Sequence, residues 1–177
     1  LIHFFKEQSI PVDILLGGEV AVHLDSSEFN LHTINGTQYI LIELPADHLP
    51  KNTAELLFNL ILKGLHPIIA HPERNQSIME EPDKLFNLLN PQVLLQITAG
   101  SLTGRFGQDS RACARFLLRK GLVSFIASDA HNAGSRRPVL SKGVAAAAKI
   151  IGQENALKLV TENPAALLAG EPIRRDP

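Results

Sequence analysis

The chain has 177 residues, of which 45% are hydrophobic and 20% are charged, with a formal net charge of -1. This composition predicts a single globular domain over residues 1–177, and the balanced charge argues against nucleic acid as the main partner. The lone cysteine, Cys113, excludes a disulfide framework, and no apolar run reaches the roughly 18 residues of a membrane span. We therefore expect a cytoplasmic protein that does not span a membrane.

Apolar runs alternate with helix-like segments along the chain. The opening stretch LIHFFKEQSIP is typical of the last turns of an amphipathic helix that stops before Pro11. The apolar runs predict strands at Val12–Val20, Tyr39–Leu44, His66–His71, Val93–Ala99 and Val123–Ser128. Helical spacing, caps and stop signals predict helices at Asn52–Gly64, Glu81–Asn90 and Asp109–Gly121, then two helices and a short final turn within Pro138–Gly170.

Strands that are apolar throughout and alternate with helices predict an α/β fold, in which helices cover a parallel sheet. In folds of this class the functional residues lie at the carboxyl ends of the strands. Four of the five predicted strands end in potential ligands, which is more than chance placement of surface acids would give. These candidate residues are Glu19, Glu43, His71, Asp129 and His131.

Together these side chains offer carboxylate and imidazole ligands but no thiolate, a set that suits Zn, Mn or Fe. A cluster of divalent ions polarises a phosphoryl or carbonyl oxygen and lowers the pKa of a bound water. Arg74 and Arg136 follow two of the strand ends, and a guanidinium pairs bidentately with phosphate oxygens. The residues alone therefore predict a metal-dependent hydrolase of anionic, phosphorylated substrates.

Four segments carry a resemblance to a known family: GGEV, LIEL, IIAHPERN, and IASDAHN followed by Arg136 and Pro138. They resemble the polymerase and histidinol phosphatase (PHP) superfamily, and within it the manganese-dependent bacterial tyrosine phosphatases of capsule biosynthesis. AHPER together with SDxHN is a specific combination, whereas GGEV or LIEL alone would be weak. The resemblance spans essentially the whole chain and implies a distorted, TIM-like β/α barrel with a trinuclear metal site.

The resemblance also implies a role for each candidate residue. Glu19 would bridge the first two metals, and Glu43 and His71 would complete the second. Asp129 would bind the first metal and His131 the third. Arg74 and Arg136 would surround the substrate phosphate as catalytic residues. The ions would be divalent, manganese first, with iron, zinc or magnesium as alternatives.

The N-terminal part of the chain lacks a motif that the family carries. No His-x-His pair occurs, and His3 and His23 stand in the wrong context to replace it. The resemblance then implies that the first two βα units of the barrel are missing. We expect an open, curved sheet with exposed edges, weak metal binding, low turnover and a tendency to associate.

The function that the resemblance implies is hydrolysis of protein phosphotyrosine in the control of capsular or exopolysaccharide synthesis. The implied partner is a phosphotyrosine protein such as a bacterial tyrosine kinase of polysaccharide export, and the chain can form oligomers. One alternative is a small-metabolite phosphatase, for example for histidinol phosphate. Another is a noncatalytic, truncated remnant that only associates with partners.

Several residues also have plain structural interpretations. Arg74 could form a salt bridge with Glu73 or Glu81, and spacing favours Arg136 over Arg137 as the second phosphate ligand. Cys113 lies on the apolar face of its predicted helix and is expected in the core. No Cys-x5-Arg loop occurs, which excludes a cysteine-based tyrosine phosphatase.

Overall fold

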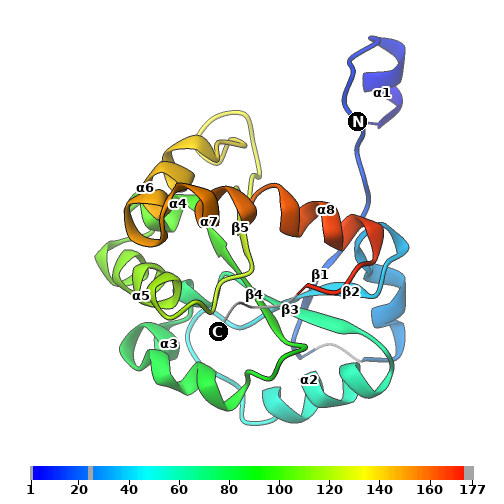
Figure 1. Cartoon of the computed structure of the whole chain (residues 1–177). Coiled ribbons are helices and arrows are strands. Elements are labelled where there is room, and N and C mark those ends of the chain that lie inside the picture. Colours follow the sequence, from blue (N-terminus) through cyan, green and yellow to red (C-terminus); the bar gives the residue numbers. More distant parts are fainter. Residues whose placement is uncertain (1, 24–25, 174–177) are drawn as a thin grey trace.

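The protein is built on one parallel β-sheet, seen in a computed structural model that describes residues 2–23 and 26–173 (Figure 1). The strands are β1 (Glu19–Ala21), β2 (Tyr39–Glu43), β3 (His66–Ala70), β4 (Leu94–Thr98) and β5 (Phe125–Ala127). They pair in the order β1-β2-β3-β4-β5, and every pair is parallel. The predicted α/β class with a parallel sheet is confirmed.

Helices connect successive strands and form most of the outer layer. The α-helices are α1 (Ile2–Glu7), α2 (Thr53–Leu62), α3 (Gln76–Glu80), α4 (Ala99–Leu102), α5 (Gln108–Arg119), α6 (Ser141–Ile151), α7 (Gln153–Lys158) and α8 (Glu162–Ala169). The 3-10 helices are η1 (Ser26–His32), η2 (Ile34–Gly36), η3 (Pro72–Arg74) and η4 (Pro82–Asn87). Among the described residues no helix combines the length and apolar character that crossing a membrane requires.

The two faces of the sheet bury different cores, because successive strand residues point to opposite sides. On the outer face, Ile42, Ile69 and Ile97 belong to the larger core, which includes buried residues of α2 and α5. On the inner face, Tyr39 and Ile68 belong to a smaller core that includes residues of α8. The end of α8 is tied to this face, since the Tyr39 hydroxyl donates a 2.6 Å hydrogen bond to the carbonyl of Glu171.

The inner face changes from apolar to polar along the strand direction. Its first half carries Tyr39, Ile68 and Leu94, which pack in the smaller core. Further along, the register aligns Glu43 of β2 with Ala70 of β3, and Ala70 with Gln96 of β4. The apolar half therefore anchors the sheet, and polar side chains gather near the carboxyl ends of its strands.

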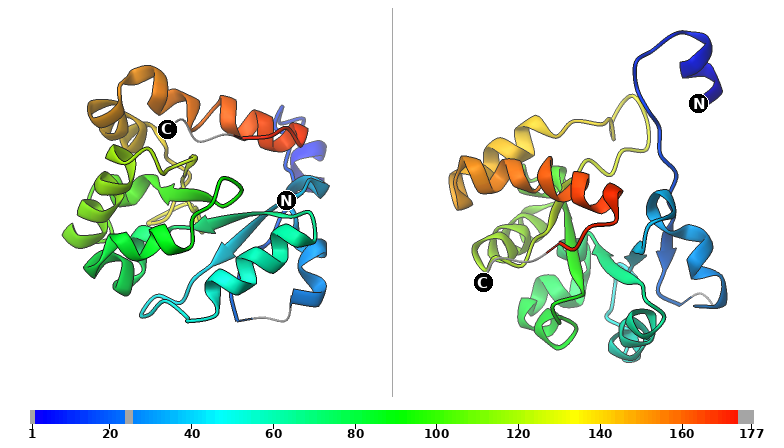
Figure 2. Two further views of the ribbon diagram at one scale, coloured as in Figure 1. Left: turned by 60° about the horizontal axis from the view of Figure 1, so that its bottom comes forward. Right: turned by 45° about the vertical axis from the view of Figure 1, so that its right-hand side comes forward.

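The prediction of a long first strand over Val12–Val20 is wrong for most of its length. Regular pairing with β2 begins only at Glu19, opposite Leu41. The preceding backbone instead bonds to the loop that follows β1: the amide of Asn35 donates to the Leu16 carbonyl at 2.7 Å, and that of Gly18 to the His32 carbonyl at 2.9 Å. Before these contacts the chain leaves the body of the protein and carries α1 outward (Figure 2).

The helices also differ from the prediction in detail. The predicted helix Glu81–Asn90 is replaced by the short 3-10 helix η4, which covers only Pro82–Asn87. Helix α3, which was not predicted, ends just before it at Glu80. The Asn75 side chain caps α3 by accepting a 3.0 Å hydrogen bond from the amide of Ile78. Helix α5 begins at Gln108, one residue before the predicted start at Asp109, and the tail contains three helices rather than two.

Candidate metal and phosphate site

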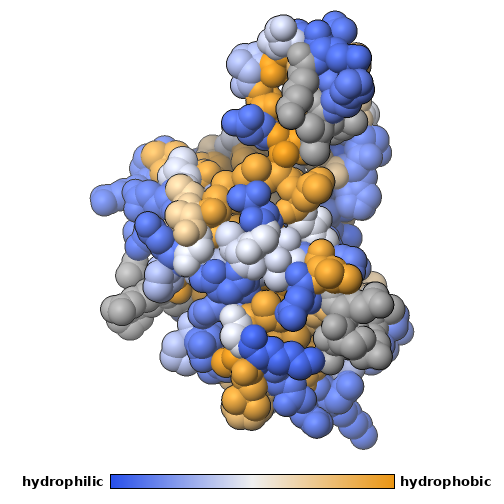
Figure 3. All heavy atoms as spheres, turned by 90° about the vertical axis from the view of Figure 1, so that its right-hand side faces the viewer, coloured by the Kyte–Doolittle hydropathy of each residue, from blue (hydrophilic) through white to orange (hydrophobic). Residues whose placement is uncertain are grey.

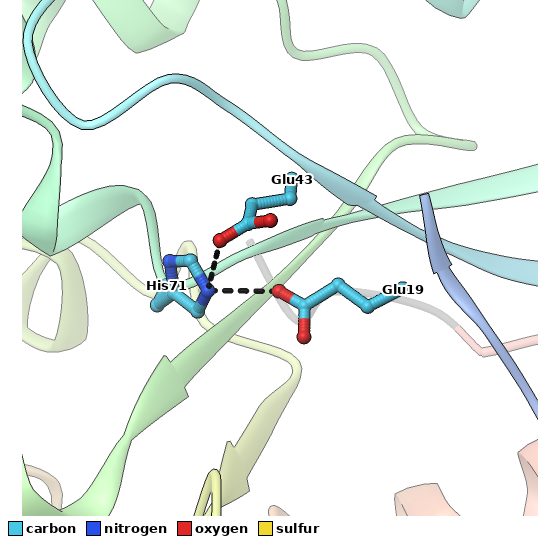
Figure 4. A group of neighbouring side chains, drawn as sticks. All are labelled: Glu19, Glu43 and His71. Carbon is cyan, nitrogen blue, oxygen red and sulfur yellow. Dashed lines mark ion pairs between the residues drawn. The ribbon is translucent and has the colours of Figure 1, made fainter. Parts of the chain in front are cut away.

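Three of the predicted ligands converge at one edge of the inner face. Glu19 is the first residue of β1, Glu43 the last of β2, and His71 directly follows β3. His71 Nε2 lies 2.8 Å from Glu19 Oε1 and 3.5 Å from Glu43 Oε1 (Figure 4). One ligand atom from each of these residues lies within 4.8 Å of the other two. We call this group the acidic triad.

The turn after β3 fixes His71 in an uncommon backbone conformation. His71 has φ 33° and ψ 50°, in the left-handed region, and its amide donates a 2.7 Å hydrogen bond to the Gln96 carbonyl. Burial by itself lowers the pKa of His71. The hydrogen bond to Glu19 and the negative charges of Glu19 and Glu73 outweigh burial and raise the pKa above the ordinary value of 6.5. The two acids beside His71 therefore favour its protonated form more than water does when no cation is bound.

A second group surrounds Asp129, which directly follows Ser128 after β5 and whose side chain is only 8% exposed. Arg74 Nη1 lies 2.5 Å from Asp129 Oδ2, and Arg136 Nη2 pairs with the same oxygen. His131 Nδ1 lies 3.5 Å from the other carboxylate oxygen. Because two guanidiniums share one carboxylate, this arginine cluster keeps a net positive charge. Arg74 pairs here and not with Glu73 or Glu81.

Glu73 holds the turn that carries both His71 and Arg74. Its fully buried carboxylate accepts hydrogen bonds from the Thr98 amide at 2.9 Å and from Ser101 Oγ at 2.7 Å. Burial raises the pKa of Glu73 above its ordinary value. The same turn presents Arg74 to the ring of Phe106, whose centroid lies 4.5 Å from the guanidinium carbon.

Asn132 stabilises the loop that brings Arg136 into contact with Asp129. Its Oδ1 accepts hydrogen bonds from the amides of Gly134 at 3.0 Å and Arg136 at 2.9 Å. No site role was predicted for Asn132 or Phe106, and Glu73 was named only as a possible salt-bridge partner of Arg74. An Asn followed by Ala-Gly is a turn signal that points to the first, whereas nothing in the sequence marks Phe106 as a partner of Arg74.

The structure thus brings the predicted residues into two clusters and not into one ligand set. Within residues 2–23 and 26–173 the acidic triad is the one group of three or more acidic, histidine or cysteine side chains close enough to hold an ion. Asp129 and His131 stand outside it, because the Asp129 carboxylate is paired with Arg74 and Arg136. The turn from His71 to Arg74 joins the two clusters.

Cys113 is buried in the larger core of the sheet. Burial, with a smaller contribution from the negative charge of Glu73, raises the pKa of its thiol to about 12. A thiol of this kind is not a nucleophile at neutral pH, because the thiolate is the reactive form. The arrangement therefore offers no thiolate chemistry at Cys113.

The donor set of the acidic triad fits a divalent cation. It combines two half-exposed carboxylates with an imidazole nitrogen, a mixture that borderline and hard divalent ions accept. The arginine cluster next to it suits an anion such as phosphate, because its guanidiniums outnumber its carboxylate. Fold and site together define an α/β protein with a candidate divalent-metal centre beside a candidate phosphate site.

Residues 1–169 match the family described as "Capsular polysaccharide synthesis, CpsB/CapC", and the chain belongs to this family. It is 39% identical to the tyrosine-protein phosphatase YwqE of Bacillus subtilis, over 97% of this chain and 68% of the relative. It is 30% identical to the tyrosine-protein phosphatase CpsB of Streptococcus agalactiae, over 89% of this chain and 68% of the relative.

A solved structure is similar as well. It comes from the crystal structures of YwqE from Bacillus subtilis and CpsB from Streptococcus pneumoniae, described as unique metal-dependent tyrosine phosphatases. The match has a TM-score of 0.90 and 38% sequence identity, and covers 99% of this chain and 72% of the other. The predicted relationship to the metal-dependent tyrosine phosphatases of capsule synthesis is confirmed.

Proposed function

We propose that the chain carries the metal and phosphate ligands of a metal-dependent phosphatase that hydrolyses protein phosphotyrosine in capsular or exopolysaccharide synthesis. One observation carries the proposal: the turn from His71 to Arg74 joins the acidic triad, which can bind a cation, to the arginine cluster, which can bind a phosphate. A phosphate monoester needs both, since its leaving oxygen and its equatorial oxygens bear developing charge. The relatives named tyrosine-protein phosphatases support the choice of substrate.

In this proposal Arg74 and Arg136 bind and orient the phosphate oxygens. Their N–H groups already converge on one carboxylate oxygen of Asp129, so an incoming phosphate finds two donors aimed at a common point. The Phe106 ring stabilises one face of the Arg74 guanidinium and leaves its donor edges free. These contacts position the phosphoryl group before any bond is broken.

Glu19, Glu43 and His71 would hold a divalent ion in the same proposal, with manganese preferred over iron, zinc or magnesium. Such an ion polarises a phosphoryl oxygen and lowers the pKa of a bound water. Asp129 and His131 would serve the further ions of the trinuclear site that the family resemblance implies. Glu73 would keep His71 and Arg74 in register through its bonds to the Thr98 amide and Ser101.

We further propose that residues 1–177 belong to one domain, a distorted β/α barrel whose first two βα units lie outside this chain. Two observations support this architecture. Strands β1 and β5 each have one strand neighbour among the described residues, and the solved relative is longer, since the match covers 72% of it. The ion sites would then be completed by residues of those units, and this chain alone would bind metal weakly.

The proposed setting is the cytoplasm, with a bacterial tyrosine kinase of polysaccharide export as the phosphoprotein partner. Association with a second copy of the chain is also proposed. Apolar side chains are exposed along the segment that leads from α1 to β1, and orange surface gathers there below α1 (Figure 3). Their exposed fractions are 38% for Ile10, 54% for Val12, 46% for Leu15 and 71% for Leu16.

The test compares phosphotyrosine peptides, histidinol phosphate and p-nitrophenyl phosphate as substrates of the full protein with manganese. We expect hydrolysis of the peptides, and its loss in Glu43→Gln and Arg74→Ala but not in the control Glu55→Gln, an exposed acid on α2. Faster hydrolysis of histidinol phosphate would favour the small-metabolite alternative. Hydrolysis of none of the three with any divalent ion would overturn the proposal and favour a noncatalytic remnant.

A further inference from the structure

A cleft of about 180 Å³ lies beside the arginine cluster, and none of the three residues of the acidic triad lines it. One wall is the segment 99–106, which includes α4, and the other is the segment 128–143, which leads from β5 into α6. Asp129 and Arg136 belong to its lining, so the cleft opens directly next to the proposed phosphate site. We call it the basic cleft.

The lining of the basic cleft is strongly cationic. Arg105, Arg136, Arg137 and Lys142 all contribute to it, and Asp129 is its only acid. The Asp129 charge is already paired with Arg74 and Arg136. Across the part of the chain that the structure describes, Arg105, Arg137 and Lys142 form no ion pair. The protein as a whole has a net charge of -1, so this local excess of unpaired positive charge indicates a surface suited to an anion.

The start of α6 adds to the positive potential. A helix N-terminus carries a partial positive charge and is stabilised by acids in its first turn. Helix α6 has none there, and its second residue is Lys142, a cation at the unfavourable end of the dipole. An anion in the cleft would face this helix end, Lys142, Arg105 and Arg137. Its negative charge would offset the mutual repulsion of these positive groups.

Close backbone packing fixes the floor of the basic cleft. A Cβ added at Gly143 would lie 2.6 Å from the Cβ of Ala99 and 2.8 Å from its carbonyl oxygen. A Cβ added at Gly100 would lie 2.9 Å from Cε2 of Phe106. Glycine at position 143 lets the two walls approach, and glycine at position 100 lets Phe106 pack closely within its own wall. The cleft is therefore formed by packed elements and not by loop side chains alone.

We infer that the basic cleft binds aspartate or glutamate side chains that flank the phosphotyrosine of the substrate. Arg105, Arg137 and Lys142 would then be specificity-determining residues. The three cations are exposed and come from both walls of the cleft, which suits carboxylates of an extended peptide better than a single buried dianion. The inference rests on the proposed function, because it places the phosphotyrosine at Arg74 and Arg136.

The test measures peptide binding to the full protein by fluorescence anisotropy, which needs no turnover. Two phosphotyrosine peptides are compared that differ only in glutamate or glutamine at the flanking positions. An exposed ion pair changes affinity by about 1.4-fold to fivefold, so three of them predict roughly tenfold tighter binding of the glutamate peptide at low salt. The triple variant Arg105→Gln, Arg137→Gln, Lys142→Gln should bring the ratio close to one.

Lys149→Gln is the matched control, because Lys149 lies on the same helix as Lys142 but outside the cleft lining. This variant should keep the preference for glutamate. A charge swap guards against misfolding of the triple variant. Lys142→Glu should weaken binding of the glutamate peptide and strengthen binding of a peptide whose flanking residues are lysines.

Equal affinity of the wild-type protein for the glutamate and glutamine peptides would overturn the inference. So would a preference that appears only when a second phosphotyrosine replaces the glutamates, because the cleft would then be a phosphate site. Failure of the proposed function looks different: no phosphate ester is hydrolysed, while the ratio of peptide affinities can still be measured.

Discussion

The acidic triad and the arginine cluster are built from similar parts but have opposite charge. Each has a carboxylate at a strand end, and each is reached from the turn after β3. In the triad, His71 faces two half-exposed acids, whereas in the cluster two guanidiniums face the single acid Asp129. The comparison teaches that neighbours, and not the acid itself, decide whether a strand end attracts a cation or an anion.

The largest effect is expected from His71→Ala. Removal of the only nitrogen ligand of the triad should lower the affinity for manganese by more than about a hundredfold, above what loss of an outer partner costs. Isothermal titration with manganese measures this, with Glu55→Gln as a control. If the contrast between the clusters is correct, phosphate binding to His71→Ala in EDTA stays near that of the wild type. A parallel loss of both affinities would show that the clusters act as one unit.

Asp129→Asn tests the other side of the comparison. Arg74 and Arg136 would keep their charges but lose the carboxylate they share, which should lower the free energy of unfolding by about 1–3 kcal/mol in EDTA. Phosphate should bind more tightly to this variant, because it no longer competes with Asp129. Urea unfolding with and without phosphate measures both effects, and Asp13→Asn, an exposed acid, serves as a control. Unchanged stability would mean that the pairing contributes little.

The pH dependence should separate the two clusters as well. The pKa of His71 is raised in the folded, metal-free protein. The pairing of His71 with Glu19 therefore contributes its full stabilisation of the fold below pH 6.5, the ordinary pKa of histidine. This stabilisation is lost as the pH rises through the raised value. The stability advantage of the wild type over Glu19→Gln should therefore shrink as the pH rises above 6.5, as followed by urea unfolding in EDTA. The advantage over Arg136→Gln should stay flat, because a guanidinium does not titrate there.

The smallest effect is expected from Phe106→Leu. Loss of the ring under the Arg74 guanidinium should weaken phosphate binding by the equivalent of about 0.5–1 kcal/mol. Phe58→Leu is a matched control, since Phe58 is 55% exposed on α2 and does not line the basic cleft. Equal phosphate affinity of Phe106→Leu and the wild type would show that Asp129 alone positions Arg74.

The sequence predicted the parts of the site that depend on strand ends. Apolar runs placed Glu43 and His71 at neighbouring carboxyl ends, and Arg74 and Arg136 were predicted as phosphate ligands because they follow two of the strand ends. The pairing of Arg74 with Asp129 could not be predicted, because it joins residues 55 positions apart through tertiary packing. For the same reason the sequence did not show that Asp129 is paired with arginines and not with the acidic triad.

The fold shows the same limits. The alternation of strands and helices was sufficient for the parallel sheet, because it follows from local hydrophobic patterns. The first strand was predicted too long, because its early residues bond to the loop after β1 and not to β2, a choice that only tertiary contacts decide. Helix α3 was not predicted from the sequence, because it is short and depends on the Asn75 side chain as its N-terminal cap.

The left-handed backbone at His71 bears on how this protein responds to laboratory evolution. Glycine or asparagine adopts that conformation with less strain than histidine does, so each would relax the turn while discarding the imidazole. Selection for heat resistance alone would therefore reward variants that have given up ion capture. Any screen for more thermostable variants therefore has to measure manganese affinity as well as melting temperature.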